Sequence, residues 1–495
     1  MPAKFLKKIP ESFELISTNE IKEISCTAYL IRHKKTNASI LYLGSTDINK
    51  TFAISFKTVP QSSNGVAHIL EHCVLSGSKK YPVKDPFLHM LKTSFKTFLN
   101  AMTYPDKTVY PVASTNNKDF SNLVDVYLDA VFFPLLRIED FKTDGWRLDF
   151  NSENELVYKG VVYNEMKGAL SSVDSYVLSH TIKNLYPGTI YKNQSGGEPE
   201  EIVNLSYEEF KDFHKKFYHP SNSQIFLYGD LDLNFYLEKL DGYFSLFELR
   251  SDFEVINPQQ PFDSVKNISL PIVPAQKNGR DGVFTMAAML KEKLSQEELL
   301  ALDVLFYCLF GSEAAPMKKI LEDGAADSLI NAGVADFVLQ PFLYMGAKGI
   351  KDGEIDRVVK SFNDLLLDSI DKLNPSHVEA ALNSVEFSYR NPSSNNLGIH
   401  FMYKIFDSWN YSKEPLETLV FENKIISLRS KDINYFKDLF KKYFVSNEHR
   451  LTIGFYPDPE LSTRREKKEK DSLAKLYSLM SPVQKDELSL LAKKL

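Results

Sequence analysis

The sequence predicts an α+β fold with two tandem copies of one domain, each an antiparallel sheet covered by helices, followed by a C-terminal helical hairpin arm. Strand-like segments come first and helical segments after them, rather than alternating as in a parallel α/β sheet. A helix–turn–strand segment also occurs twice, and 495 residues exceed what one core usually holds. These observations together favour a two-copy layered architecture.

The first predicted elements are strands at residues 27–33, 39–43 and 51–58. In the third of them, the large apolar residues Phe52, Ile54 and Phe56 alternate with small or polar residues. This alternation is typical of a half-buried strand. We therefore expect a half-buried antiparallel meander at the start of the chain.

Helical patterns follow the strands. Residues 66–75 have helical apolar spacing and end at a Ser-Gly-Ser turn. A second helix is predicted from Asp85 and Pro86 to about residue 99, and an amphipathic helix covers 119–133 after an extended segment. A further helix begins at Val161.

The repeated segment sets the predicted domain limits. Residues 215–222 precede the apolar strand 225–228, and residues 441–447 precede the strand 451–456 at nearly the same spacing. We expect a first domain, a polar, Pro-rich linker, a second copy and an arm. Their predicted limits are 1–256, 257–279, 280–459 and 460–495.

The predicted arm is a charged segment followed by spaced leucines, with Pro482 near the start of its second helix. One interpretation is a solvated C-terminal arm. The other is a connector whose continuation is missing, because the chain stops at Leu495 without a helix terminator.

Composition excludes several classes of protein. Lys plus Arg number 59 against 65 Asp plus Glu, and a formal charge of −6 does not suit a nucleic-acid binder. Three scattered cysteines do not form a disulfide framework. The N-terminal residues show no signal-peptide pattern, and no window approaches a membrane helix, so we expect a cytoplasmic protein with no membrane partner.

The motif that carries chemistry is His68-Ile69-Leu70-Glu71-His72. Two imidazoles four residues apart project from the same helix face, and they can supply two of the three protein ligands of a catalytic zinc ion. Glu71 lies beside them and can act as the base for a water whose pKa the metal lowers. The alternative is a helix whose histidines only make structural hydrogen bonds.

A third ligand is required, and the chain offers several acids. Glu165 lies among Val162, Tyr163 and Met166, whose apolar character predicts that it is buried. A buried carboxylate is unfavourable unless it is paired or binds a metal, which makes Glu165 the best candidate. The other candidate acids are Asp149, Glu153 and Glu155.

Three further segments complete the pattern, namely residues 75–82, 98–103 and 162–168. Together with the inverted motif they resemble the inverzincin (pitrilysin-type) metallopeptidases, and most closely the presequence protease and falcilysin branch. The resemblance implies a metallopeptidase-half fold, with a catalytic first domain and a non-catalytic second repeat.

The resemblance also implies roles for single residues. It makes His68, His72 and Glu165 the Zn²⁺ ligands and Glu71 the general base. Asp149 would suit a related branch and stays as a minor alternative ligand. The resemblance places Asn100 and Ala101 at an edge strand that binds the substrate peptide, whereas residue type alone favours Asn100 as a helix C-cap.

We therefore expect a zinc-dependent endopeptidase, or its catalytic half, that hydrolyses short unfolded peptides in a closed chamber. The resemblance implies a C-terminal half as partner, in the same longer chain or a separate one. One alternative is a non-catalytic peptide-binding or assembly subunit of the same fold, and a weaker one is a metal-dependent lyase with the same inverted motif.

Overall fold

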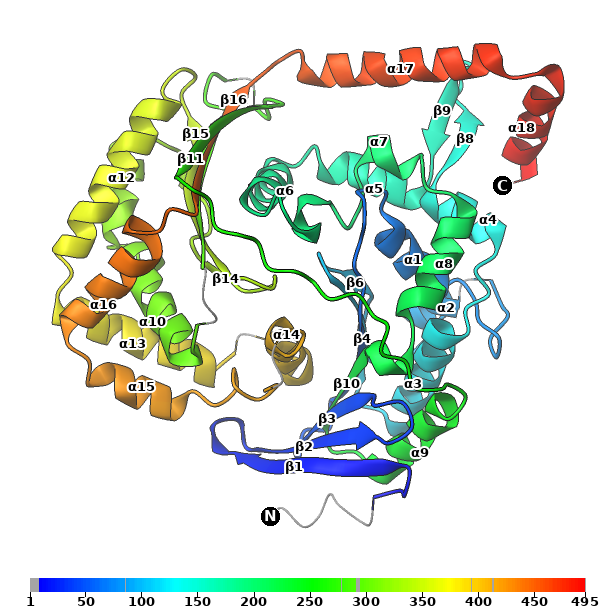
Figure 1. Ribbon diagram of the computed structural model, residues 1–495, viewed down its shortest axis with the longest axis horizontal. Helices are drawn as coiled ribbons and strands as arrows, with labels where there is room; N and C mark the ends of the chain where they lie inside the picture. Colours follow the sequence, from blue (N-terminus) through cyan, green and yellow to red (C-terminus); the bar gives the residue numbers. More distant parts are fainter. Residues whose placement is uncertain are drawn as a thin grey trace.

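The computed structural model describes residues 9–84, 86–276, 278–290, 294–392, 394–411 and 414–494. It shows two lobes, each a sheet with helices, and an arm that runs across the first lobe (Figure 1). The predicted helix start at Asp85 lies outside the described residues.

The first lobe is built on an eight-stranded sheet in the order β1-β2-β3-β10-β4-β7-β5, with β6 also paired to β7. Its strands are β1 (Phe13–Ile21), β2 (Cys26–His33), β3 (Ser39–Gly44), β4 (Lys50–Lys57), β5 (Lys96–Leu99), β6 (Met102–Thr103), β7 (Lys107–Ser114) and β10 (Ser223–Gly229). Strand β1 is not among the sequence predictions.

The predicted meander is wrong in one respect, because β10 lies between β3 and β4. It runs parallel to β3 and antiparallel to β4. Ile225, Phe226 and Leu227 of β10 have no solvent-exposed surface. A strand that is apolar on both faces is most stable at the centre of a sheet, which explains the insertion.

The expectation that residues 51–58 are half-buried is also wrong. Strand β4 is buried along nearly its whole length. The face that a single layer would leave in water is covered by helix α14 (Leu397–Trp409), which comes from the second lobe. Ala53 of β4 and Met402 of α14 share this core although they are far apart in the chain, so sequence periodicity within β4 cannot predict the cover.

Helices cover the other face of the first sheet. They include α1 (Val66–Val74), α2 (Pro86–Thr93), α3 (Asn117–Phe132), α8 (Tyr207–Phe217) and α9 (Leu233–Phe244). The second predicted helix ends at Thr93 rather than near residue 99, because the next residues form β5 and pair with β7. Phe98 lies opposite Ala113 in that pairing, so the segment gains more as a strand.

The second lobe repeats the arrangement of the first sheet. Its strands follow the order β11-β16-β12-β15-β13, with β14 on β15, and β16 is parallel to β11 and antiparallel to β12. They are β11 (Lys266–Ile272), β12 (Gly282–Met289), β13 (Ser328–Leu329), β14 (Gly333–Ala335), β15 (Phe342–Ile350) and β16 (Arg450–Pro457). The α+β class is confirmed, and the second sheet begins inside the range 257–279 expected as a linker.

The two lobes exchange one helix each. Helix α6 (Val173–Leu185) of the first lobe packs on the second sheet through Tyr176 and Val177, which are buried with Phe455. Helix α14 of the second lobe packs on the first sheet through Phe401 and Ile405. Both helices lie between the sheets in Figure 1, so the lobes share cores rather than a simple contact surface.

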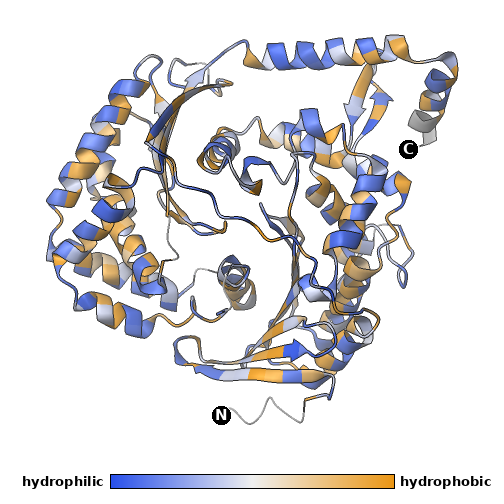
Figure 2. Cartoon of the chain, in the orientation of Figure 1, coloured by the Kyte–Doolittle hydropathy of each residue, from blue (hydrophilic) through white to orange (hydrophobic). Residues whose placement is uncertain are grey.

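The arm consists of α17 (Leu461–Leu479) and α18 (Pro482–Lys494). Its charged side chains pair with the first lobe, as in the Lys167–Glu469 contact at 2.8 Å, and Leu473 is buried. Figure 2 shows α17 as largely hydrophilic, with hydrophobic residues toward its end. The arm therefore rests on the first lobe, although much of it is solvated as expected.

One described stretch, Gln296–Glu322, is apolar enough by length and composition to cross a membrane, so the expectation that no window comes close is wrong. Helix α10 (Gln296–Phe306), at its start, lines the second core with Leu302, Val304 and Leu305. A core helix passes the same test, and these contacts give the stretch that interpretation.

Candidate metal centre and active site

The inverted motif lies on helix α1. Val66, Ile69, Leu70, Cys73 and Val74 are buried in the first core, so the apolar positions fix how the helix is rotated. The remaining side of the helix carries both imidazoles. The side chain of His68 is 18% exposed and that of His72 is 25% exposed. The packing of α1 therefore directs the two rings out of the core and toward a second helix, which carries Glu165.

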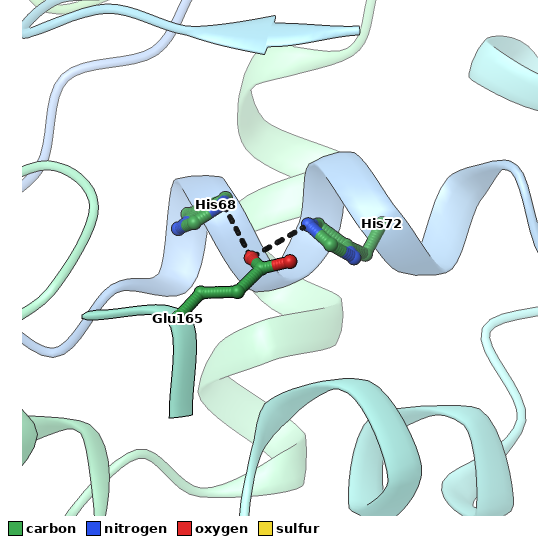
Figure 3. A group of neighbouring side chains, drawn as sticks. All are labelled: His68, His72 and Glu165. Carbon is green, nitrogen blue, oxygen red and sulfur yellow. Dashed lines mark ion pairs between the residues drawn. The ribbon is translucent and has the colours of Figure 1, made fainter. Parts of the chain in front are cut away.

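That helix is α5 (Val161–Ala169), which carries Glu165. Glu165 Oε2 lies 3.6 Å from His68 Nε2 and 3.4 Å from His72 Nε2, and the two ring centroids are 5.1 Å apart (Figure 3). All three donor atoms lie within 4.8 Å of one another. The structure thus brings together the three residues that the sequence analysis selects as ligands.

The predicted burial of Glu165 is wrong, because its side chain is 49% exposed. Val162, Tyr163 and Met166 are buried on one face of α5, while Glu165 lies on the opposite face with Asn164. The apolar neighbours orient the carboxylate toward the imidazoles instead of enclosing it. The sequence argument selected this residue for a reason that the structure does not support.

Glu71 lies in a different environment from Glu165. It is 8% exposed, and Thr103 Oγ1 of strand β6 donates a hydrogen bond of 2.6 Å to its Oε2. Burial raises the pKa of Glu71, while the charge of His68 and the hydrogen bonds from the Thr103 hydroxyl and main-chain N–H oppose that rise. Burial also lowers the pKa of His72, to about 4, which favours the neutral ring that binds a metal.

A glycine loop holds the first imidazole. His68 Nδ1 lies 3.2 Å from the carbonyl oxygen of Gly196, which leaves Nε2 facing Glu165. The loop can approach α1 closely because a Cβ on Gly197, at φ +105°, would lie 2.9 Å from the Cα of Gly65. This contact was not predicted from the sequence. The closely spaced Gly196 and Gly197 were the one available signal of it.

The alternative acids lie elsewhere. Asp149 is on strand β8 (Arg147–Phe150), where it pairs with Arg147 and Lys159 at 3.2 Å each. Burial raises the pKa of Asp149, but the hydrogen bond from the Phe150 main-chain N–H and the contacts with Lys159 and Arg147 outweigh burial and keep the pKa below its usual range. Glu153 and Glu155 belong to the exposed turn after that strand. None of the three acids joins the histidine cluster among the described residues.

Asn100 and Ala101 lie between the edge strands β5 and β6. Asn100 donates its main-chain N–H to Pro111, as an extended residue paired with β7 does. The C-cap interpretation of Asn100 is therefore wrong, because the preceding residues form a strand. The Asn100 carbonyl accepts a hydrogen bond from Tyr127, which further fixes this edge.

Three other residues with side chains that could bind a metal or react, Cys73, His214 and His219, make structural contacts instead. Cys73 is fully buried beside Asp144, and burial raises the pKa of its thiol well above the usual value. His214 contacts the Val131 carbonyl, and His219 accepts a hydrogen bond from the main-chain N–H of Ser221. These three residues do not join the cluster.

The three donors suit zinc. Two atoms each ~2.1 Å from a tetrahedral centre lie about 3.4 Å apart, close to the distances from Glu165 to the two imidazoles. Two neutral imidazoles and one carboxylate are a common catalytic set that leaves one position open. The residues present therefore fit a zinc ion both in the distances between their donor atoms and in their ligand types.

Family models match both lobes. The model described as Insulinase (Peptidase family M16) matches residues 59–169, and that of the Peptidase M16 inactive domain matches residues 204–385. The first match contains the histidine cluster, and the second lies largely in the second lobe. The chain thus combines two domain types of one peptidase family, and it belongs to the M16 (insulinase/pitrilysin-type) family.

Individual relatives support one branch of that family. Presequence protease 1 of Arabidopsis thaliana is 39% identical over 96% of this chain and 46% of its own length. Protein HypA of Clostridium perfringens is 40% identical over 94% of this chain and 49% of its own. The chain spans about half the length of these relatives, and it resembles the presequence protease branch.

Solved structures show the same fold at low sequence identity. A protease from Helicobacter pylori matches with a TM-score of 0.67 at 14% identity, covering 87% of this chain and 99% of that one. Pitrilysin matches with a TM-score of 0.63 at 16% identity, over 91% of this chain and 47% of its own. This likeness concerns the fold alone.

Proposed function

We propose that the protein is a zinc-dependent endopeptidase, or the catalytic half of one, that hydrolyses short unfolded peptides. The observation that carries the proposal is the convergence of His68, His72 and Glu165 on one point, with Glu71 on the same turn of α1. M16 peptidases are generally zinc-dependent. The names of the presequence protease relatives support a peptidase function.

In this mechanism the two imidazoles and the Glu165 carboxylate would hold the zinc ion. When bound, the ion supplies a Lewis acid and lowers the pKa of a ligated water to about 7. Glu71 accepts the proton of the attacking water and returns it to the leaving amine. Gly196 keeps the His68 ring in the orientation that leaves Nε2 free for the metal.

The peptide would bind along the sheet edge formed by β5 and the segment of Asn100 and Ala101. An extended peptide added to an edge strand is held by main-chain hydrogen bonds, which tolerate many sequences. Such a mode selects unfolded peptides because only they can supply a free strand. It would bring a peptide bond past α1, since β6 contacts Glu71 through Thr103.

A further half would complete the site. The chain spans about half the length of the relatives described above. The family resemblance implies two such halves, which close around the peptide. We propose that this partner half encloses the substrate and contributes groups that stabilise the oxyanion. Peptide substrates and the partner half are the binding partners of the proposal.

Fluorogenic peptide cleavage tests the function. The zinc-loaded chain should cleave an unfolded peptide, lose the activity with a chelator and regain it with added Zn²⁺. A His68→Ala variant should lose both zinc and cleavage, whereas His377→Ala, an exposed histidine on α13 (Pro375–Arg390), should keep both. Peptide binding without cleavage in the presence of zinc would favour the non-catalytic subunit instead.

A further inference from the structure

We propose that Thr103 is the positioning residue of the general base and that the second repeat holds Thr103 in place. The inference rests on the proposed function and assigns a role to a lobe that lacks the zinc motif.

Thr103 contacts the base at two points. Its hydroxyl donates a hydrogen bond of 2.6 Å to Glu71 Oε2, and its main-chain N–H also donates to that carboxylate. A glutamate side chain has several rotatable bonds, and two donors from one residue restrict it to one orientation. Because Glu71 is largely buried, these donors also replace hydration that the carboxylate loses.

Strand β6 is too short to fix Thr103 by itself. It has two residues, Met102 and Thr103, which pair with Val109 and Thr108 of β7. A two-residue edge strand frays easily unless its ends are anchored. The anchor must therefore come from the turn between β6 and β7 or from side-chain contacts made across it.

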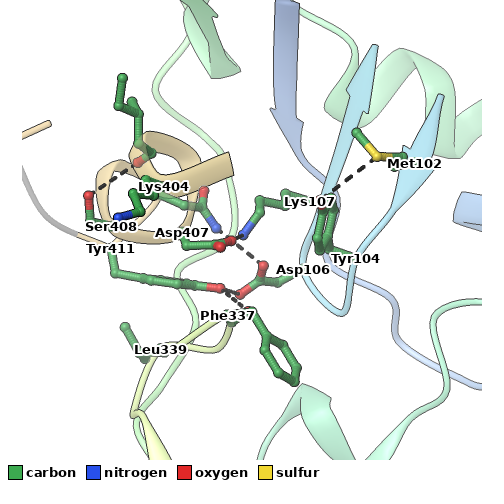
Figure 4. Close-up of polar contacts among 12 residues, drawn as sticks. Met102, Tyr104, Asp106, Lys107, Phe337, Leu339, Lys404, Asp407, Ser408 and Tyr411 are labelled. Atoms are coloured by element: carbon green, nitrogen blue, oxygen red, sulfur yellow. Dashed lines mark hydrogen bonds and ion pairs between the residues drawn. The ribbon is translucent and has the colours of Figure 1, made fainter. Parts of the chain in front are cut away.

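The turn is anchored by Asp106, which has no solvent-exposed surface. Its carboxylate accepts hydrogen bonds from the hydroxyl groups of Tyr191 at 2.6 Å and Tyr411 at 2.7 Å, and from Asn410 Nδ2 at 3.2 Å. The Tyr411 hydroxyl also lies 2.8 Å from the Phe337 carbonyl (Figure 4). One segment of the second lobe, Asn410 and Tyr411, thus contacts a residue three positions from Thr103, and Phe337 of the same lobe contacts Tyr411.

Two further contacts come from α14. The Lys107 ammonium, 1% exposed, pairs with Asp407 at 3.0 Å, and the Tyr403 hydroxyl lies 3.2 Å from the Met102 sulfur. A buried ion pair fixes geometry because separating its partners leaves an uncompensated charge. Residues on both sides of Thr103 are therefore held by one helix of the second repeat.

The arrangement separates two tasks at one sheet edge. Strand β5 with Asn100 would receive the peptide, while the Thr103 hydroxyl is turned to the base. Loss of that hydroxyl should consequently slow the chemical step without weakening peptide binding. This distinguishes a positioning residue from a residue of the peptide-binding edge.

The test compares Thr103→Val, which keeps the main-chain N–H, with Thr103→Ser, which restores a hydroxyl. In the zinc-loaded chain, Thr103→Val should lower kcat about tenfold at unchanged KM and unchanged zinc content, and Thr103→Ser should recover to within about twofold of the parent. Thr108→Val is the matched control. It removes the buried hydroxyl of the residue directly opposite Thr103 on β7, which bonds Thr58 and not Glu71, and should leave kcat unchanged.

The lobe contact is tested by Tyr411→Phe, which should lower kcat two- to fivefold with KM unchanged. In a Glu71→Gln background, Thr103→Val should leave the Kd for the same peptide unchanged. Parental kcat in Thr103→Val, or weaker peptide binding in the Glu71→Gln background, would overturn the role of Thr103. Parental kcat in Tyr411→Phe would overturn the role of the second repeat. Absence of cleavage by the zinc-loaded parent would instead contradict the proposed function itself.

Discussion

At the scale of single residues, the site separates two glutamates by environment. Glu165 is half-exposed and faces the imidazoles, whereas Glu71 is buried and held by Thr103. A metal ligand needs an accessible carboxylate, and a base benefits from a fixed position and a raised pKa. The two side chains therefore suit the two roles proposed for them.

Glu71→Gln tests the base directly. The amide oxygen can still accept from Thr103, so the local structure should persist, but the side chain can no longer take a proton. We expect cleavage to fall by about 10²–10⁴-fold, with one zinc ion still bound. Peptide assays together with metal analysis check this, and an active Glu71→Gln variant would exclude Glu71 as the base.

The sequence was sufficient to select the two histidine ligands because their spacing is local. Helical geometry places His68 and His72 on one face whatever surrounds them. Glu165 was selected for an expected burial that the structure does not show. The contact between Gly196 and His68 was not predicted, because it joins segments 128 residues apart.

At the scale of elements, α5 depends on a close backbone approach at Gly160, the residue immediately before its start. A Cβ on Gly160 would lie 2.0 Å from the Gly145 carbonyl oxygen, which belongs to the backbone and cannot simply rotate away. The position of Glu165 thus depends on a glycine five residues earlier. This close approach also explains why α5 starts where it does.

Gly160→Ala should displace the start of α5 and weaken zinc binding at least tenfold, with the overall circular dichroism spectrum retained. Gly168→Ala is the matched control. Gly168 is on the same helix, and a Cβ there would face open space. Titration with zinc measures both variants. Equal zinc affinity in Gly160→Ala and Gly168→Ala would contradict the dependence of Glu165 on Gly160.

Elements that depend on local pattern were predicted, and those that depend on distant partners were not. Helix α1 follows its apolar spacing. The residues of β5 are predicted as the end of a helix, but they form a strand because they pair with β7. The buried second face of β4 likewise depends on α14. Long-range packing overrides local propensity in both cases.

At the scale of the whole molecule, folding keeps several histidines neutral. Burial lowers the pKa of His214 to about 4, and the same holds for His180 and His400. In the unfolded chain these rings titrate near 6.5. Between these values the unfolded state binds more protons, so the free energy of unfolding falls as the pH drops.

We therefore expect these histidines to lower the melting temperature of the zinc-free chain between about pH 6.5 and pH 4. Asp303 and Asp336, whose pKa values burial raises to about 7 and about 6, act in the opposite direction over the same range. His214→Gln should reduce the histidine effect, because it removes one ring that the unfolded state protonates. His377→Gln, at an exposed position, should leave it unchanged. Thermal melts at several pH values provide the measurement, and identical slopes for parent and His214→Gln would contradict the explanation.

The two-lobe unit should be a weak peptidase without the partner half. Oxyanion donors contribute about 10²–10³ in rate, and we propose that the partner supplies them. Adding that half should raise the cleavage rate by a comparable factor while zinc content stays constant. Full activity of this chain alone would show that its own residues complete the site.

The most direct test is a crystal structure of the zinc-loaded chain with anomalous scattering recorded at the zinc edge. We predict one peak bonded to His68 Nε2, His72 Nε2 and a carboxylate oxygen of Glu165, each at ~2.0–2.2 Å. A zinc ion bound elsewhere, or bound to the histidines while Glu165 points away and no other acid replaces it, would contradict the account.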